Sequence, residues 1–172
     1  MTFCVEADEA AGESGLDIEA LFDLCARRAL HFTGCPFECE VDLTVTTDEE
    51  IRKLNSKYRG IDRATDVLSF PMLEFEEPGR FDIDEDMKAE CFDPENDELM
   101  LGSIVISLER AVSQARDFGH SLKREMAFLI VHSMLHLQGF DHIEENDRIV
   151  MEKAQEEILD DLEITREAAL EE

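Results

Sequence analysis

The sequence predicts an α+β fold in which a small mixed β-sheet packs with about five α-helices. Three observations predict this fold. Residues 38–47 alternate apolar and polar side chains, as a half-buried strand does. Residues 101–107 are almost continuously apolar, which is typical of a strand inside a sheet. The stretches around these strands carry apolar residues at helical spacing, so strands and helices alternate along one layered domain.

The first half of the chain has a predicted helix on each side of the alternating strand. Residues 17–33 carry apolar side chains at helical spacing, and Gly34 is expected to end this helix. Thr47 and Glu50 form a capping box, which opens a second helix through about Tyr58. This second helix carries several of the chain's basic residues.

The second half of the chain supplies the remaining elements. They are a short strand over residues 66–70 and three helices, over residues 107–118, 121–137 and about 144–162. The helix over residues 121–137 is apolar on most of its sides, so it is expected to lie in the core. Because 172 residues can bury a proper core and no internal repeat is evident, residues 1–172 are expected to form a single domain.

Residues 74–98 form the most acidic segment of the chain. They hold twelve Asp and Glu residues against Arg80 and Lys88, a local balance of −10, with two prolines and no sustained periodicity. Such a segment predicts a mobile acidic surface loop outside the core. The acidic tail, residues 166–172, is expected to fray.

The overall charge argues against nucleic acid, because a chain with a net charge of −27 repels phosphate. The charge is nevertheless unevenly distributed. Residues 51–70 have a local net charge of +3. They contain two acidic residues, Asp62 and Asp66, and five basic ones, Arg52, Lys53, Lys57, Arg59 and Arg63. This basic cluster is either a solvated helix face or a surface that binds a phosphate backbone.

The sequence indicates a soluble protein of the cytoplasm, without a membrane partner. The amino terminus, MTFCVEADEA, lacks the basic start and apolar core of a signal peptide. The longest apolar stretch, residues 126–137, is interrupted by polar residues and is too short to span a bilayer. The five cysteines include no CxxC pair, which fits free thiols in a reducing compartment.

Three of the five histidines, His132, His136 and His142, fall within eleven residues. The step from His132 to His136 is one helical turn, so both imidazoles leave the same helix face. Gly139 can adopt a positive φ and fold the chain back, which brings His142 toward them. Three neutral imidazoles with an open fourth position suit one divalent metal ion, for which zinc is expected.

The spacing HxxxHxxGxxH is also the ligand spacing of the metzincin zinc proteases, so the predicted helix and turn are zincin-like. Those proteases carry Glu directly after the first His, where it acts as general base. This chain has Ser133 there, and a hydroxyl is too weakly basic to take a proton from water at neutral pH. Peptide hydrolysis by that route is therefore disfavoured.

Two separated motifs resemble one known family. The first motif, N-x-x-Y-R-x-x-D-x-x-T-D-V-L-S-F-P, runs from Asn55 to Pro71, and the second is the histidine motif. Together they resemble the YbeY family of bacterial ribosomal RNA maturation factors, which are metal-dependent single-strand endoribonucleases. The resemblance covers roughly residues 40–73 and 100–160. The chain departs from the family at Ser103, where members commonly carry Asp.

The resemblance implies a zinc-type site with one ion per chain at His132, His136 and His142. It also implies a functionally essential arginine at Arg59, beside the metal pocket. The predicted catalytic residues are therefore Arg59 and, as a metal ligand, His132. The implied partners are ribosomal RNA, the small ribosomal subunit, a ribosomal protein and a ribosome-associated GTPase.

The remaining polar residues have predicted roles at such a site. Arg59 can stabilise the negative charge that develops on phosphodiester oxygens, while Arg52, Lys53, Lys57 and Arg63 can hold the RNA backbone. Asp141 is expected either to orient a neighbouring ligand by a hydrogen bond or to serve as a turn carboxylate. No general base is evident. Two alternatives to a ribonuclease stay open: a zinc-dependent hydrolase of peptide or amide bonds, and a non-enzymatic ribosome-assembly factor with a structural metal.

Overall fold

The computed structural model describes residues 1–165, which form an α+β fold as predicted. The strands are β1 (Thr2–Ala7), β2 (Cys39–Thr46), β3 (Val67–Pro71) and β4 (Leu99–Ser107). The helices are α1 (Glu9–Glu13), α2 (Ile18–Thr33), α3 (Asp48–Arg59), α4 (Glu85–Cys91), α5 (Leu108–Phe118), α6 (Leu122–Leu137) and α7 (Glu145–Asp161). None of the helices in this range combines the length and the apolar character needed to cross a bilayer.

The four strands form one mixed sheet in the order β1-β2-β4-β3. The first three strands of this order run parallel, and β3 runs antiparallel to β4. Ile104 of β4 pairs with Leu43 of β2 on one side and with Ser69 of β3 on the other. The almost continuously apolar strand is thus an interior strand, as predicted, and β3 forms an edge of the sheet.

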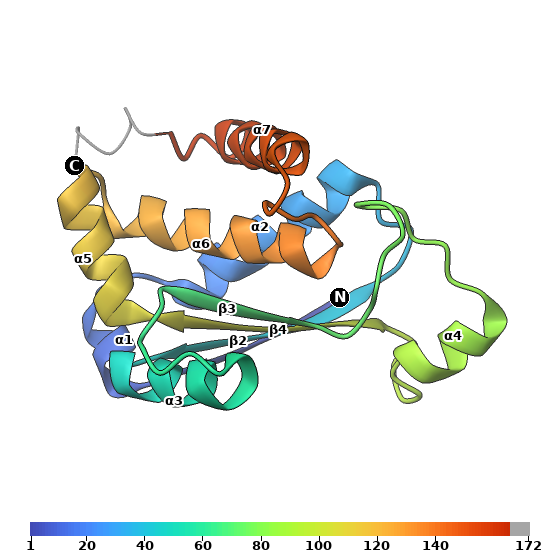
Figure 1. The fold of residues 1–172 in the computed structure, drawn as a ribbon, viewed down its shortest axis with the longest axis horizontal. Helices are drawn as coiled ribbons and strands as arrows, with labels where there is room; N and C mark the ends of the chain where they lie inside the picture. The colour runs from blue at the N-terminus through green and yellow to red at the C-terminus, as the bar shows by residue number, and fades with distance from the viewer. Residues whose placement is uncertain (166–172) are drawn as a thin grey trace.

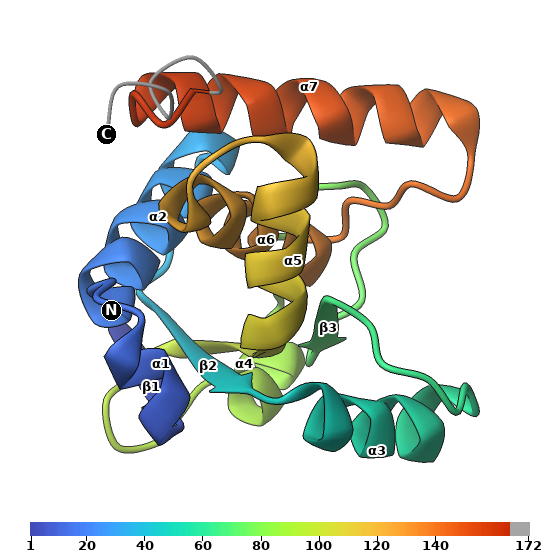
Figure 2. The same cartoon turned by 90° about the vertical axis from the view of Figure 1, so that its left-hand side faces the viewer.

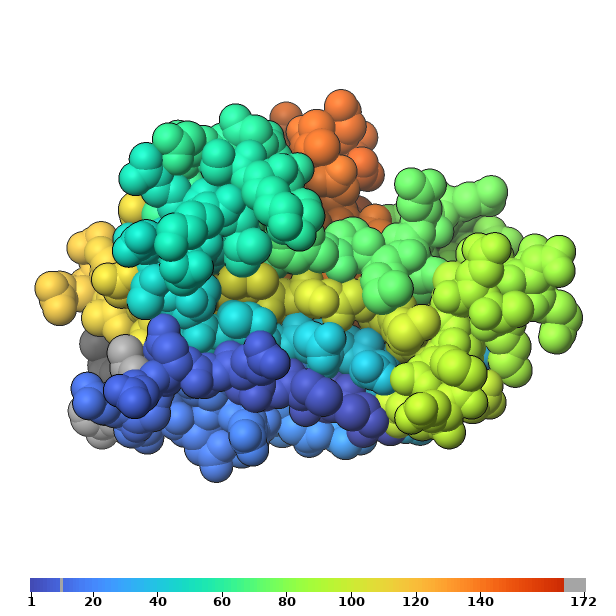
Figure 3. Space-filling model, turned by 90° about the horizontal axis from the view of Figure 1, so that it is seen from below, coloured from blue at the N-terminus to red at the C-terminus, as the bar shows by residue number. Residues whose placement is uncertain are grey.

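Helices cover the two faces of the sheet unequally. The views in Figure 1 and Figure 2 show α2 and α6 on one face, α7 on their outer side and α3 on the opposite face. The main core lies between the sheet and α2 and α6, and a small cluster of Ile51, Leu68 and Val105 lies between the sheet and α3. Seen from below, atoms of β1 and β2 reach the surface beside α3 (Figure 3).

Three elements of the structure were not predicted from the sequence: β1, α1 and α4. Strand β1 lies at the edge of the sheet opposite β3, and none of its residues is fully buried, so its side chains show no clean alternation. The two helices have five and seven residues, which is too short for a helical period to be recognised. They bring the helices within residues 1–165 to seven, against the five or so expected.

Residues 74–98 differ from the predicted loop, because they contain α4 and carry aromatic side chains that pack on the rest of the protein. The rings of Phe81 and Phe92 lie 6.4 Å and 5.2 Å from that of Phe37, and Phe75 packs against the main core. These aromatic residues stand at irregular intervals among acidic ones, so they produce no periodic signal. The mobility of this segment stays a prediction, and the frayed tail predicted for residues 166–172 lies outside the described residues.

Candidate metal centre

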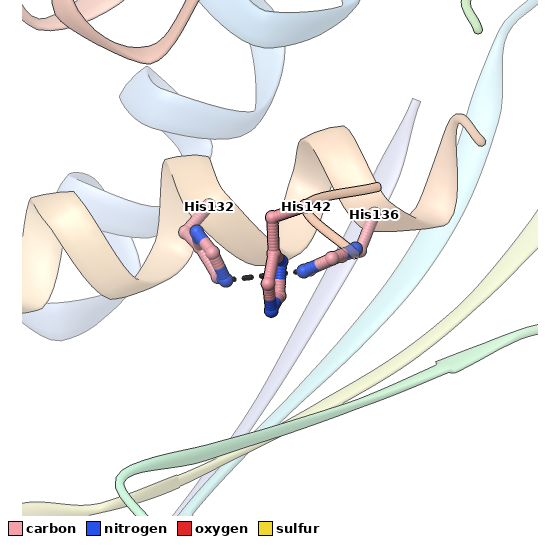
Figure 4. Close-up of side chains that lie close together, drawn as sticks. All are labelled: His132, His136 and His142. Atoms are coloured by element: carbon pink, nitrogen blue, oxygen red, sulfur yellow. Dashed lines mark hydrogen bonds between the residues drawn. The ribbon is translucent and has the colours of Figure 1, made fainter. Parts of the chain in front are cut away.

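Three histidines meet at the carboxyl end of α6. His132 and His136 lie on the last turns of this helix, His142 lies on the turn that follows, and the three rings point toward one another (Figure 4). One nitrogen from each ring belongs to a group whose members all lie within 4.8 Å of one another. The two Nε2 atoms of His132 and His136 are 3.1 Å apart. The convergence that the spacing predicted is therefore present.

The chain reversal after α6 brings the third histidine to the other two. The helix ends at Leu137, and Gly139 then adopts a φ of +87°, in the left-handed region that glycine adopts without strain. The N–H of Phe140 donates to the carbonyl of Leu135, which closes the turn over the helix end. The segment that follows returns past the helix terminus and carries His142.

Hydrogen bonds on the outer side of two rings determine which nitrogen faces the site. Nδ1 of His136 lies 2.9 Å from the carbonyl oxygen of Phe140, which can only accept, so Nδ1 carries the proton and Nε2 is bare. Nδ1 of His132 lies 3.1 Å from Oε1 of Gln155 on α7 and donates in the same way. Such bonds orient ligating imidazoles and raise their basicity. The sequence contained no signal for Gln155, because only tertiary packing brings α7 to α6.

The donor set fits a small divalent cation. The lone pairs of the two bare Nε2 atoms face each other at 3.1 Å, an arrangement that is repulsive without a cation between them. Tetrahedral zinc with Zn–N bonds of about 2.0–2.1 Å separates its ligand nitrogens by about 3.3 Å, close to this distance. His142 is exposed, so the site opens toward solvent on one side.

Burial keeps the two helical histidines neutral. It lowers the pKa of His136 to about 4, with a further contribution from the neighbouring His132. Burial also lowers the pKa of His132, and the hydrogen bond to Gln155 opposes this effect in part. Both rings are therefore neutral at pH 7, with Nδ1 protonated and Nε2 free to bind a metal ion.

A cavity of about 770 Å³ opens onto the three histidines. Its opposite wall comes from the end of α3 and from β3, and includes Arg59, Thr65, Asp66 and Ser69. A volume of this size is typical of sites for small ligands. Two parts of the chain that are far apart in sequence thus face each other across one cavity.

Arg59 is the last residue of α3, and its exposed side chain lines this cavity. An ordinary arginine at a helix end would bond the terminal carbonyls. Within residues 1–165, however, the guanidinium of Arg59 makes no hydrogen bond and no ion pair. It is therefore available to an anion in the cavity.

The other members of the basic cluster lie farther from the histidines. Three of them already have partners nearby: Arg52 forms an ion pair with Asp62, Lys53 forms one with Glu50, and the ammonium of Lys57 lies over the ring of Tyr58. None of these three lines the cavity, and Arg63 lines an adjoining cavity. The structure therefore brings only Arg59 of the cluster to the histidines.

Asp66 also lines the cavity, and its role there could not be predicted from the sequence. Its Oδ1 accepts from the N–H of Val67 at 2.8 Å, and its Oδ2 accepts from the side chain of Gln114 at 3.3 Å. The charge of Asp66 slightly opposes the lowering of the His132 pKa by burial, so the carboxylate acts on the site electrostatically. The one signal in the sequence was its place in the T-D-V-L-S-F-P run. A carboxylate in this position can orient a water molecule or accept its proton.

Three further positions can be placed relative to the cavity. Asp141 accepts a hydrogen bond of 2.6 Å from the backbone N–H of His142, as a turn carboxylate does. The Nδ1 atoms of His132 and His136 bond to Gln155 and Phe140 and not to Asp141. Ser133 is completely buried, on the core side of α6. Ser103 does not line the cavity, and it alternates along β4 with the residues that face α6.

Known proteins resemble this chain over nearly its whole length. Residues 6–163 match the family described as "Endoribonuclease YbeY". The chain is 50% identical over 148 residues to an endoribonuclease YbeY of Lachnoclostridium phytofermentans, covering 86% of this chain and 90% of that one. It is 47% identical over 166 residues to an endoribonuclease YbeY of Agathobacter rectalis, covering 96% and 100%. The solution structure of TM1509 from Thermotoga maritima has a similar fold, with a TM-score of 0.55 and 22% identity over 94% of this chain and 92% of that chain.

Proposed function

The chain belongs to the endoribonuclease YbeY family, and we propose that it is a metal-dependent endoribonuclease that cleaves single-stranded RNA in ribosomal RNA maturation and ribosome quality control. One observation carries the proposal: three converging histidines and the unpaired guanidinium of Arg59 face each other across one cavity. A metal site opposite an arginine without a partner among the described residues suits a phosphodiester substrate, because cleavage places negative charge on the phosphate oxygens that would lie between the two.

The residues of the cavity can be assigned roles in this reaction. His132, His136 and His142 would hold one divalent metal ion, and their nitrogen donors suit zinc. The ion would supply a Lewis acid for a phosphoryl oxygen and for the attacking water. Arg59 would bind a non-bridging oxygen and stabilise its charge as water attacks phosphorus and the leaving P–O bond breaks. Asp66 would accept the proton that this water loses.

The structure argues against both alternative functions. A metzincin-like peptidase needs a base directly after the first histidine, and here that position, Ser133, is completely buried in the core. A purely structural metal is normally closed off by four protein ligands. Here three histidines border a cavity of about 770 Å³, and His142 is exposed.

Family membership extends the proposal to the partners of the protein. The substrate would be ribosomal RNA of the small ribosomal subunit, and a ribosomal protein and a ribosome-associated GTPase would accompany it. Such a substrate would place the activity in the cytoplasm. These assignments rest on the family and not on a feature of the cavity.

The proposal is tested with purified protein reconstituted with zinc, manganese or magnesium. Metal content is measured by mass spectrometry, and cleavage is measured on a single-stranded RNA and on the same RNA in a duplex. His136→Ala is expected to lose stoichiometric metal and cleavage together. His31→Ala is the matched control, because His31 is exposed in the last turn of α2 and does not line the cavity. Full metal occupancy or undiminished cleavage in the folded His136→Ala protein would contradict the proposed site.

A further inference from the structure

A second cavity of about 430 Å³ adjoins the metal cavity. The two cavities share Arg59, Thr65 and Asp66, so they adjoin each other at the end of α3. The second cavity lies beyond Arg59 as seen from the histidines, and α5 contributes to it through Arg110 and Gln114. Its volume falls in the range of about 300–1,000 Å³ that small-ligand sites occupy.

The lining of the second cavity is cationic in a chain that is strongly anionic. Three arginines, Arg59, Arg63 and Arg110, line it together with one acidic residue, Asp66. Arg63 makes no side-chain hydrogen bond and no ion pair within residues 1–165. Arg110 bonds Asp48 through Nε alone, so its terminal nitrogens remain available. An excess of unpaired guanidinium donors in a hollow is the arrangement that binds phosphate.

Two buried or half-buried amides hold this lining in place. Asn55, which is only 2% exposed, donates through Nδ2 to the backbone carbonyl of Arg63 at 2.8 Å. Its Oδ1 is buried and has no hydrogen-bond partner in the structure. The side chain of Gln114 donates to Asp66 at 3.3 Å and keeps that carboxylate engaged. The backbone of Arg63 is thus fixed by a buried side chain, while its exposed guanidinium stays available to a ligand.

We propose that the second cavity binds the nucleotide next to the scissile linkage, with its phosphate held between Arg63 and Arg110. This inference rests on the proposed function, because it places a second unit of the same RNA strand. Arg59 lies between the two cavities, so it contacts the reacting phosphate while Arg63 and Arg110 contact the neighbouring one. The two adjoining cavities therefore set the register of the RNA strand over the histidines.

The first test removes single charges from the protein and from the RNA. A single-stranded RNA with one mapped cleavage site is synthesised as a series in which each phosphodiester in turn is a neutral methylphosphonate. For the zinc-loaded wild type, kcat/KM should fall about tenfold when the linkage adjacent to the scissile one is neutralised. Arg63→Gln should show the same tenfold loss on the unmodified RNA and no further loss on that modified RNA.

Arg116→Gln is the matched control, because it removes the same charge from an exposed position that lines neither cavity. It should keep the full response of the wild type to the methylphosphonate series. If Arg63→Gln keeps that response as well, or if no adjacent linkage is sensitive in the wild type, the second cavity is not a phosphate subsite.

A second measurement does not depend on cleavage, so it separates this inference from the proposed function. Binding of a fluorescein-labelled thymidine hexanucleotide to zinc-loaded protein is followed by anisotropy at several salt concentrations. Arg63→Gln should weaken binding about tenfold and reduce the slope of log K against log salt by about 0.7, the value for one phosphate contact on a single strand. Arg116→Gln should change neither quantity. Unchanged binding by Arg63→Gln overturns the inference, whereas normal binding without any RNA cleavage by the wild type overturns only the proposed function.

Discussion

The side chain of Phe75 closes over Gly139 in the turn between the second and third histidines. A Cβ atom added to Gly139 would lie 2.5 Å from the Cβ of Phe75 and 2.9 Å from its Cγ. The N–H of Gly79 adds a hydrogen bond of 2.8 Å to the carbonyl of Gln138, directly before this turn. The acidic segment of residues 74–98 therefore supports the turn that carries His142.

Gly139→Ala should weaken metal binding at least tenfold. An alanine there would strain the backbone at a φ of +87° and would collide with Phe75, so the turn must open and move His142. Zinc affinity is measured by competition with a chromogenic chelator. Gly119→Ala is the control, because its φ is +69° but nothing lies within 4 Å of the added Cβ. Equal affinities of the two variants would show that the contact with Phe75 does not hold the turn.

Gln155→Leu should lower metal affinity by roughly 10- to 100-fold, which is the usual effect of removing a partner that orients a ligand. Leucine cannot accept the hydrogen bond from Nδ1 of His132, so the ring loses its fixed orientation. The same chelator competition measures the effect, and Gln155→Glu should restore much of the affinity because it keeps an acceptor. If the leucine variant bound metal as tightly as the wild type, Gln155 would not support the metal site.

Arg59→Glu should reduce single-turnover cleavage of single-stranded RNA on the order of 10²- to 10³-fold, because a preorganised donor is lost and a like charge faces the phosphate. Folding and metal content should be preserved, since the side chain is exposed and has no partner within residues 1–165. Arg52→Glu makes the same charge change on the same helix outside the cavity, and its rate should fall much less. Similar cleavage rates for both variants would show that Arg59 has no role in the reaction beyond that of the other basic residues.

Glu125→Gln should change how stability depends on pH. In the folded protein the pKa of Glu125 is raised from 4.5 to about 7. Burial is the main cause, and the negative charge of Asp66 adds to it. The unfolded chain releases this proton near pH 4.5 and the folded chain near pH 7, so the wild type loses stability as pH rises through that window. At pH 8 the glutamine variant should therefore be more stable than the wild type by on the order of 2 kcal/mol, and at pH 4 the two should be alike.

Urea denaturation of chelator-treated protein measures this difference without a contribution from metal binding. His120 is a potential partner, with Nε2 at 3.1 Å from the Glu125 carboxylate. A glutamine variant that is less stable than the wild type at pH 8 would show that a charged His120–Glu125 pair outweighs the cost of burial.

The parts of the site that depend on local structure could be predicted from the sequence. His132 and His136 share a helix face because of the helical period, and Gly139 permits the turn that follows. Gln155 could not be predicted as a partner of His132, because the two meet only when α7 packs on α6. The position of Asp66 at the metal cavity likewise depends on where β3 lies in the sheet.

The same distinction explains the differences in the fold. The interior position of β4 could be predicted from its apolar composition, since an interior strand is covered on both faces. The pairing of β1 with β2 could not, because α2 separates the two strands in sequence and β1 is only partly buried. The attachment of residues 74–98 combines aromatic contacts with Phe37 and a backbone hydrogen bond from Gly79, none of which leaves a periodic signal in the sequence.

All three histidines lie within one stretch of eleven residues, whereas the opposite wall of the cavity comes from the end of α3 and from β3. The proposed metal ligands and the wall opposite them are therefore encoded by separate segments of the chain. If the proposed function holds, substitutions in this wall outside Arg59 and Asp66 should alter which RNA is cleaved while residues 132–142 keep their geometry. New specificities could then be selected from a library of wall variants that leaves Arg59, Asp66 and residues 132–142 untouched.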